Sequence, residues 1–292
     1  MIPYAIPDTV VSQGDVTRLR DAARREETAC GSGRLVWRVW GREGEPVVLL
    51  HGGSGSWVHW MRNVGALVRA GHVVYVPDLP GFGESSLPPE GFDADSHTEW
   101  ILSGLEKLLG SSPYDLVGFS FGSLVATFVA VQRPLQVRRL ILVGAPSLSE
   151  LPGARVEIKN WRTFSCAKKV RDAHRHNLGA IMLAGDESVE DYIIDLYSAD
   201  AEQDRIPQRR LFKTDILLRQ MSSVRCPVWG VWGSNDALHR GCMESILAGL
   251  SRAPLFQALT LIPFSGHWVQ FEAAERFNRT LRAALDVRVT ER

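Results

Sequence analysis

The chain has 292 residues, of which 45% are hydrophobic and 23% are charged, a composition typical of globular proteins. Its 33 basic and 33 acidic residues give a formal net charge of 0, so we expect neither a nucleic-acid partner nor a membrane partner. No apolar run is long enough to cross a bilayer, and the N-terminus shows no pattern of a secretory signal. The four cysteines form no C-x-x-C pair, so we expect reduced thiols in a cytoplasmic protein without a metal site.

Residues 1–33 are expected to form an N-terminal extension, with a charged helical stretch at 15–28. Apolar runs then predict strands at 34–40, 46–50, 72–76, 114–119, 139–143, 227–232 and 259–262. Helical patterns between them fall at 57–70, 96–109, 123–131 and 269–285. Apolar strands that alternate with helices predict an α/β fold with a mostly parallel, doubly wound sheet. Ligands of such sheets bind beyond the carboxyl ends of the strands.

Residues 147–224 interrupt this alternation. They are rich in polar residues, with helical patterns at 156–161, 170–183, 189–197 and 204–221. An insertion of this size is too long for a bare loop. We therefore predict a helical cap, or lid, at 147–224 after the strand at 139–143, which is the sixth strand of the expected fold, and a core domain formed by 34–146 and 225–292.

The sequence Gly-Phe-Ser-Phe-Gly at 118–122 lies between a predicted strand and a predicted helix. Glycine on both sides of Ser120 allows a turn so sharp that side chains there would collide with the strand and the helix. Such a turn holds a serine hydroxyl in the open at a helix N-terminus, where negative charge is favoured. Ser120 is therefore the candidate nucleophile, although an ordinary glycine-rich turn would have the same pattern.

A serine hydroxyl needs a base, and the base needs a partner that fixes its tautomer. His267 follows the last predicted strand and a glycine, which makes it the candidate base. Asp236 follows the preceding strand, in Gly-Ser-Asn-Asp at 233–236, and is the candidate acid. These residues have the chain order Ser, Asp, His that is expected when the serine lies in an elbow of this type.

The loop His-Gly-Gly-Ser-Gly at 51–55 follows the predicted strand 46–50. A tetrahedral intermediate needs two donors aimed at its oxyanion, and we expect them to be the backbone N–H groups of Phe121 and Gly53. A phosphate-binding loop is the alternative, but neither a following Lys-Ser/Thr nor a G-x-G-x-x-G spacing is present. His51 is expected to brace the loop.

In this order, the motifs resemble those of the α/β-hydrolase superfamily, and the resemblance extends from residue 34 to residue 285. Within that superfamily, residues 62–71 and 266–272 and the pair Phe277-Asn278 resemble the meta-cleavage product hydrolases, which break C–C bonds in aromatic degradation.

The resemblance also implies substrate-binding positions. His59 stands where that family usually has an asparagine. Tyr197 stands where it has a lid arginine that grips the substrate carboxylate. Trp268 matches a family tryptophan beside the base, with packing under the lid as the alternative role. The loop after His51 is shorter than is usual in the family and places Ser54 at the site.

We therefore expect a cofactor-independent serine hydrolase that acts on a small to medium, fairly apolar ester or related acyl compound. Hydrolysis of a C–C bond by the same residues is the alternative within this class, and cofactor-free peroxidation of carboxylic acids would use the same triad. A non-catalytic ligand-binding or sensor protein on the same fold is the alternative of another class. The expected partner is a small-molecule substrate. A homodimer is kept as an alternative to a monomer.

Overall fold

A single eight-stranded sheet forms the centre of the computed structural model, which describes residues 6–149, 155–185, 189–206 and 209–287. The strands are Arg24–Cys30 (β1), Gly33–Trp40 (β2), Glu45–Leu50 (β3), His72–Pro77 (β4), Tyr114–Phe119 (β5), Val137–Val143 (β6), Val228–Gly233 (β7) and Phe256–Ile262 (β8). Their order in the sheet is β1-β2-β4-β3-β5-β6-β7-β8. β2 is antiparallel to β1 and β4, and the other pairs are parallel. The predicted α/β fold is therefore confirmed.

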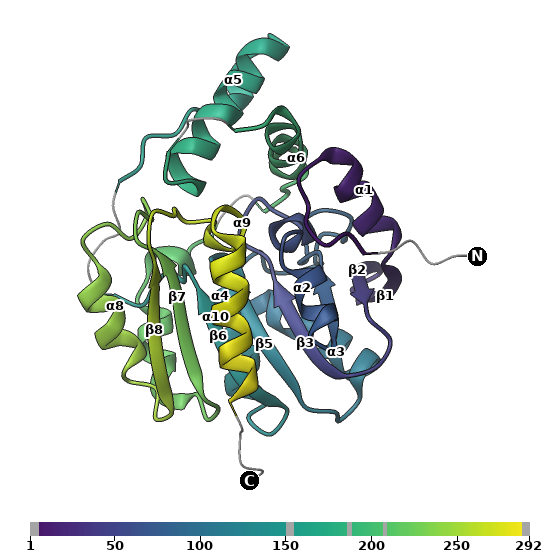
Figure 1. The fold of residues 1–292 in the computed structure, drawn as a ribbon, viewed down its shortest axis with the longest axis vertical. Coiled ribbons are helices and arrows are strands. Elements are labelled where there is room, and N and C mark those ends of the chain that lie inside the picture. Colours follow the sequence, from purple (N-terminus) through teal and green to yellow (C-terminus); the bar gives the residue numbers. More distant parts are fainter. Residues whose placement is uncertain (1–5, 150–154, 186–188, 207–208, 288–292) are drawn as a thin grey trace.

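Helices cover both faces of this sheet (Figure 1). They are Gln13–Asp21 (α1), Val64–Arg69 (α2), Ala94–Leu109 (α3), Phe121–Gln132 (α4), Met243–Leu250 (α8), Val269–Glu272 (α9) and Ala274–Asp286 (α10). One apolar cluster joins the sheet to α3, α4 and α8, through side chains such as Leu105 and Leu124. A second cluster joins the opposite face to α1, α2 and α10, through side chains such as Leu67 and Leu281. Burial on both faces explains why the inner parallel strands β3, β5, β6 and β7 read as continuous apolar runs.

The N-terminal region differs from the prediction of a helical stretch at 15–28. The helix α1 ends at Asp21, and Arg24–Cys30 is a strand at the edge of the sheet. Its burial alternates at the C-terminal end, where Thr28 and Cys30 are buried, while its charged side chains face solvent. Charges of this kind protect an exposed sheet edge, and they also make the strand look helical in the sequence.

The insertion, residues 147–224, follows β6 as predicted and lies above the carboxyl ends of the strands (Figure 1). Its helices are Ala167–Asn177 (α5), Asp191–Glu202 (α6) and Ile216–Gln220 (α7). Single turns occur at Trp161–Thr163, Leu178–Met182, Leu211–Lys213 and Met221–Ser223. The helix expected over 204–221 is broken because its backbone binds the core instead: the N–H of Leu211 donates to Asp93 at 2.9 Å, and that of Leu218 donates to Ser147 O at 2.9 Å.

Residues 182–184, near the middle of the insertion, are hydrogen-bonded to the segment that follows β8. The carboxylate of Glu272 accepts hydrogen bonds from the N–H of Gly266 at 2.5 Å and from the N–H of Ala184 at 2.9 Å. The N–H of Trp268 donates to Met182 O at 2.6 Å. These bonds connect residues 182–184 to the segment that carries His267. Within the described residues, no helix combines the length and the apolar character that a membrane span requires.

Candidate active site

Ser120 lies at the sharp turn between β5 and α4, with backbone angles φ 48° and ψ −116°. A Cβ on Gly118 would lie 2.6 Å from Ser123 Cα, and one on Gly122 would lie 2.5 Å from His51 O. Glycine is therefore required on both sides of the serine. The turn is held by a hydrogen bond from Ser120 N to Val143 O at 2.8 Å. A strained, positive φ at a non-glycine residue is common at functional sites.

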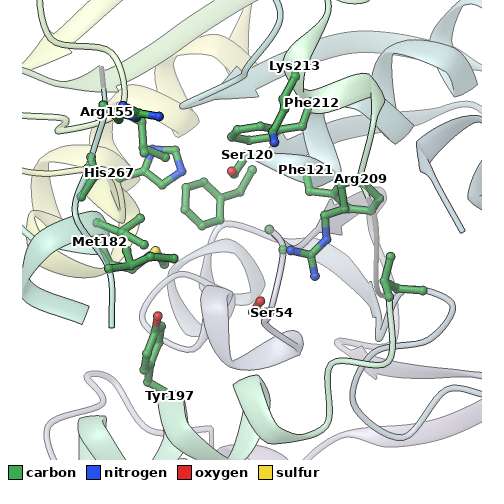
Figure 2. Close-up of a pocket in the computed structure, with 18 of the residues that line it drawn as sticks. Ser54, Ser120, Phe121, Arg155, Met182, Tyr197, Arg209, Phe212, Lys213 and His267 are labelled. Carbon is green, nitrogen blue, oxygen red and sulfur yellow. The ribbon is translucent and has the colours of Figure 1, made fainter. Parts of the chain in front are cut away.

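Asp236 and His267 come together from two loops that follow adjacent strands, β7 and β8. The His267 Nδ1 atom lies 2.8 Å from Asp236 Oδ2, and both side chains are buried. The His267 ring also packs on Phe119, the residue before Ser120, with ring centroids 4.9 Å apart. Ser120 and His267 line the same cavity, as Figure 2 shows. The contact through Nδ1 leaves the His267 Nε2 atom available to a reacting group.

Two buried histidines hold the loop that follows β3. His51 Nε2 accepts the N–H of Leu79 at 2.8 Å, which agrees with its expected bracing role. His59 Nδ1 accepts the N–H of Gly52 at 3.1 Å. Burial holds the pKa of His59 well below its usual value, so its ring stays neutral and can accept this hydrogen bond. The two histidines therefore hold the loop on its buried side, while Gly53 lines the cavity.

The cavity has a volume of about 1030 Å³, at the upper end of the range of small-molecule sites. It lies between the strand ends and the insertion. Apolar side chains form much of its wall: Phe119, Phe121, Val156, Ile158, Ile181, Met182, Ile206, Phe212 and Leu238. The cavity thus has room for a small or medium-sized molecule with an apolar body.

Four basic residues of the insertion, which the sequence motifs did not indicate, also line the cavity: Arg155, Arg209, Arg210 and Lys213. None of the described lining residues carries a carboxylate. The Arg209 guanidinium lies above the rings of Phe82 and Phe121, at 5.2 and 5.7 Å from their centroids, and pairs with Asp204. A Cβ on Gly53 would lie 3.0 Å from Arg209 Nη1, so this cation lies beside the loop after β3. In the sequence, the adjacent arginines at 209–210 were the pattern that could have indicated these basic lining residues.

The four predicted substrate-binding residues divide into two pairs. Ser54 and Tyr197 line the cavity, and burial raises the pKa of Tyr197 to about 12, so its hydroxyl stays protonated. The Ser54 hydroxyl donates to Asp204 at 2.5 Å.

His59 and Trp268 are not among the lining residues and are almost fully buried. Trp268 donates Nε1–H to His59 O at 3.0 Å and stacks on Phe271, with centroids 4.2 Å apart. Both side chains thus pack behind the residues that line the cavity, and their substrate-binding role stays a prediction. For Trp268, these contacts agree with the alternative role of packing.

Comparison with known proteins agrees with this architecture. Residues 45–166 match the family described as "alpha/beta hydrolase fold". A 2-hydroxy-6-oxononadienedioate/2-hydroxy-6-oxononatrienedioate hydrolase of Comamonas testosteroni is 27% identical over 81% of this chain and 86% of its own length. A 2-hydroxy-6-oxo-6-phenylhexa-2,4-dienoate hydrolase of the same species is also 27% identical, with the same coverage. Among solved structures, a bromoperoxidase from Bacillus anthracis has a TM-score of 0.73 at 22% identity, over 90% of this chain and 99% of that chain.

The bromoperoxidase likeness shows the fold, and the two sequence relatives are hydrolases. The sheet order, the serine at the β5–α4 turn and the family match all lead to the same assignment. This chain is a hydrolase with the α/β-hydrolase fold.

Proposed function

We propose that the chain is a cofactor-independent serine hydrolase in which Ser120 is the nucleophile, His267 the general base and Asp236 the partner of that base. The observation that carries the proposal is the 2.8 Å contact between His267 Nδ1 and Asp236 Oδ2. The same histidine lines the cavity together with Ser120. Asp236 fixes the Nδ1–H tautomer, which directs the lone pair of Nε2 toward the substrate side.

The first step is attack of Ser120 Oγ on the acyl carbon of the substrate while its proton moves to His267 Nε2. The resulting oxyanion is stabilised by the backbone N–H groups of Gly53 and Phe121, neither of which donates a hydrogen bond to another described residue. His267 then protonates the leaving group. Water attacks the acyl-enzyme with His267 again as base, which releases the acid and restores Ser120.

The insertion acts in this proposal as the cap that covers the site, because its residues form much of the cavity wall. Its basic side chains favour a substrate with a carboxylate at one end. Arg209, which pairs with Asp204, lies beside the loop after β3, and none of the described lining residues carries a carboxylate. We therefore propose an acyl substrate with an apolar body and an anionic group, a change from the fairly apolar substrate expected from the sequence.

Hydrolysis of a C–C bond is the second candidate. It is favoured by the two relatives from Comamonas testosteroni, whose substrates are named as oxo-dienoates and therefore carry carboxylates. The same residues would form the acyl-enzyme, with carbon in place of oxygen as the leaving atom. Ester and C–C substrates with matched carboxylates distinguish these two reactions.

The test begins with a fluorophosphonate probe, which modifies an activated serine. We expect covalent labelling of the wild-type protein at Ser120 and none in Ser120→Ala. Asp236→Asn should label much more slowly, because loss of the carboxylate destabilises the imidazolium and the correct tautomer; the analogous change in a serine protease lowers kcat by a factor on the order of 10⁴. A wild-type protein that remains unlabelled would instead support the ligand-binding alternative.

Substrate class is then measured with three compounds: p-nitrophenyl butyrate, the mono-p-nitrophenyl ester of glutaric acid and a 2-hydroxy-6-oxo-dienoate. We expect the carboxylated ester to have the lower KM of the two esters. Turnover of the dienoate at a kcat/KM above that of both esters would assign the C–C reaction. A lower KM for the butyrate would overturn the proposed carboxylate preference.

A further inference from the structure

A second histidine contacts the carboxylate of Asp236. His239 lies three residues after Asp236 in the loop between β7 and α8, and its Nδ1 atom is 2.9 Å from Asp236 Oδ2. This is the same oxygen that His267 Nδ1 approaches at 2.8 Å. The other oxygen, Oδ1, accepts the N–H of Leu238 at 3.0 Å. One carboxylate oxygen therefore faces two imidazole rings.

The surroundings fix His239 in this position. Its ring meets Trp232 edge to face, with centroids 6.0 Å apart, and lies 5.7 Å from the His267 ring. The backbone N–H of Cys242 donates to His239 O at 3.0 Å and closes the turn. His239 is only 8% exposed, so water does not compete freely for its contact with Asp236.

Both rings must donate Nδ1–H, because a carboxylate oxygen can only accept. We infer that His239 is a positioning residue that limits the basicity of His267 through the Asp236 oxygen that the two rings share. The inference rests on the proposed function and adds a fourth residue to its triad. His239 itself does not line the substrate cavity among the described residues, so it acts on the reaction only through Asp236.

The state of Asp236 supports this arrangement. Burial raises the pKa of Asp236, but the charge of His267 and the hydrogen bonds from His239 and His267 outweigh it and hold that pKa well below its usual range. The carboxylate is therefore ionised wherever the enzyme works. The titratable groups that contact His239 in the described structure are Asp236, on its own loop, and His267, on the loop after β8.

The direction of the effect does not depend on the charge of His239. A neutral His239 takes part of the hydrogen-bonding capacity of Oδ2, and a protonated one adds a positive charge beside His267. In both cases the imidazolium of His267 is less stable than it would be with Asp236 alone. Removal of His239 should therefore make His267 a stronger base, which is protonated up to a higher pH.

The test measures the rate of Ser120 modification by a fluorophosphonate between pH 5 and pH 9. In His239→Leu, the acidic limb of this profile should move to higher pH by about one pH unit, the size expected for loss of one hydrogen bond to a charged group. His239→Asn keeps an amide N–H at the place of Nδ1, so its limb should lie close to that of the wild type. His72→Leu, which removes a histidine from the opposite end of the sheet, should leave the profile unchanged.

If His239→Leu is labelled and the acidic limb of its pH profile does not move, the inference is overturned and the proposed function stays intact. An equal shift in the leucine and asparagine variants would also overturn it, because the hydrogen bond would then not carry the effect. Absence of labelling in the wild type would refute the proposed function and the inference with it. If His239→Leu does not fold, His239→Gln replaces it, because the longer side chain places its amide beyond the position of Nδ1.

Discussion

Gly233, the last residue of β7, lies so close to Ser265 that a Cβ on Gly233 would come within 2.2 Å of the Ser265 carbonyl oxygen. Two hydrogen bonds join the same segments, from Ser234 N to Ile262 O and from Asn235 N to Ser265 O, both at 2.9 Å. Asp236 and His267 follow directly on these two segments. The backbone contact therefore sets the distance between the proposed acid and the proposed base.

Gly233→Ala should separate the two segments, because a backbone carbonyl cannot move aside as a flexible side chain can. We expect a loss of about 1–3 kcal/mol in the free energy of unfolding, measured with urea, as for other overpacked sites. The rate of Ser120 labelling should fall as well. Gly185→Ala is the matched control, since a Cβ there meets no atom of the described residues within 4 Å. A Gly233→Ala protein with normal stability and labelling would show that the contact relaxes without effect.

His59→Leu tests whether His59 holds the loop after β3, which carries Gly53, or binds substrate. The leucine leaves the buried N–H of Gly52 without an acceptor, so we expect kcat to fall about tenfold or more with little change in KM. His59→Asn should recover part of kcat, because its amide oxygen can accept the same N–H. A change confined to KM would return His59 to the role of a substrate contact.

Arg209→Met should affect substrates according to their charge. Loss of a charged hydrogen-bond donor should raise KM for the glutarate ester about tenfold or more, while KM for p-nitrophenyl butyrate should change little. Arg175→Met is the control, because Arg175 lies on α5 and pairs with Asp191 away from the cavity lining. An equal loss with both esters would mean that Arg209 supports the loop rather than the substrate.

Asp200 makes stability depend on pH. Burial raises its pKa from 3.8 to about 8, and its carboxyl group accepts a hydrogen bond from the Ser56 hydroxyl at 3.0 Å. Between pH 4 and pH 8 the folded state keeps a proton that the unfolded state has released, so the free energy of unfolding falls as pH rises through this range. Below about pH 4 both states are protonated and this loss disappears.

Asp200→Asn should remove that dependence, since asparagine is neutral and can accept the same hydrogen bond. We expect the variant to be more stable than the wild type by about 1–3 kcal/mol at pH 8 and to match it near pH 4, in urea unfolding at both pH values. Asp195→Asn, at an exposed position of the same helix, should show no such gain. A constant difference between Asp200→Asn and the wild type at both pH values would exclude ionisation of Asp200 as the cause.

The elbow, the sheet and the two loops with Asp236 and His267 could be predicted because local sequence determines them. Gly118 is required by contacts within one strand–turn–helix unit, Gly122 by the backbone at the end of the adjacent strand β3, and the inner strands of the sheet are apolar and buried. The edge strand Arg24–Cys30 could not be found in this way. Its charged face has no apolar alternation, and only pairing with β2 makes it a strand.

His239 and Arg209 show why the remainder of the site was missed. Nothing near His239 in the sequence indicates that its ring turns back to the Asp236 oxygen beside His267. Arg209 reaches Gly53 across more than 150 residues of chain, through a segment predicted to be helical that is in fact folded onto the core. Contacts of this kind depend on where the insertion lies, and no local pattern encodes that position.

The bonds that Glu272 makes to Gly266 and Ala184 hold one side of the cover of the cavity in place. Outward motion of residues 182–184 would pull on the segment that holds His267, so this side must stay still throughout a catalytic cycle. Arg155 and Lys213 also line the cavity, and their exposed side chains form no hydrogen bond within the described chain. An incoming anion should therefore be attracted by these two cations before it reaches the serine.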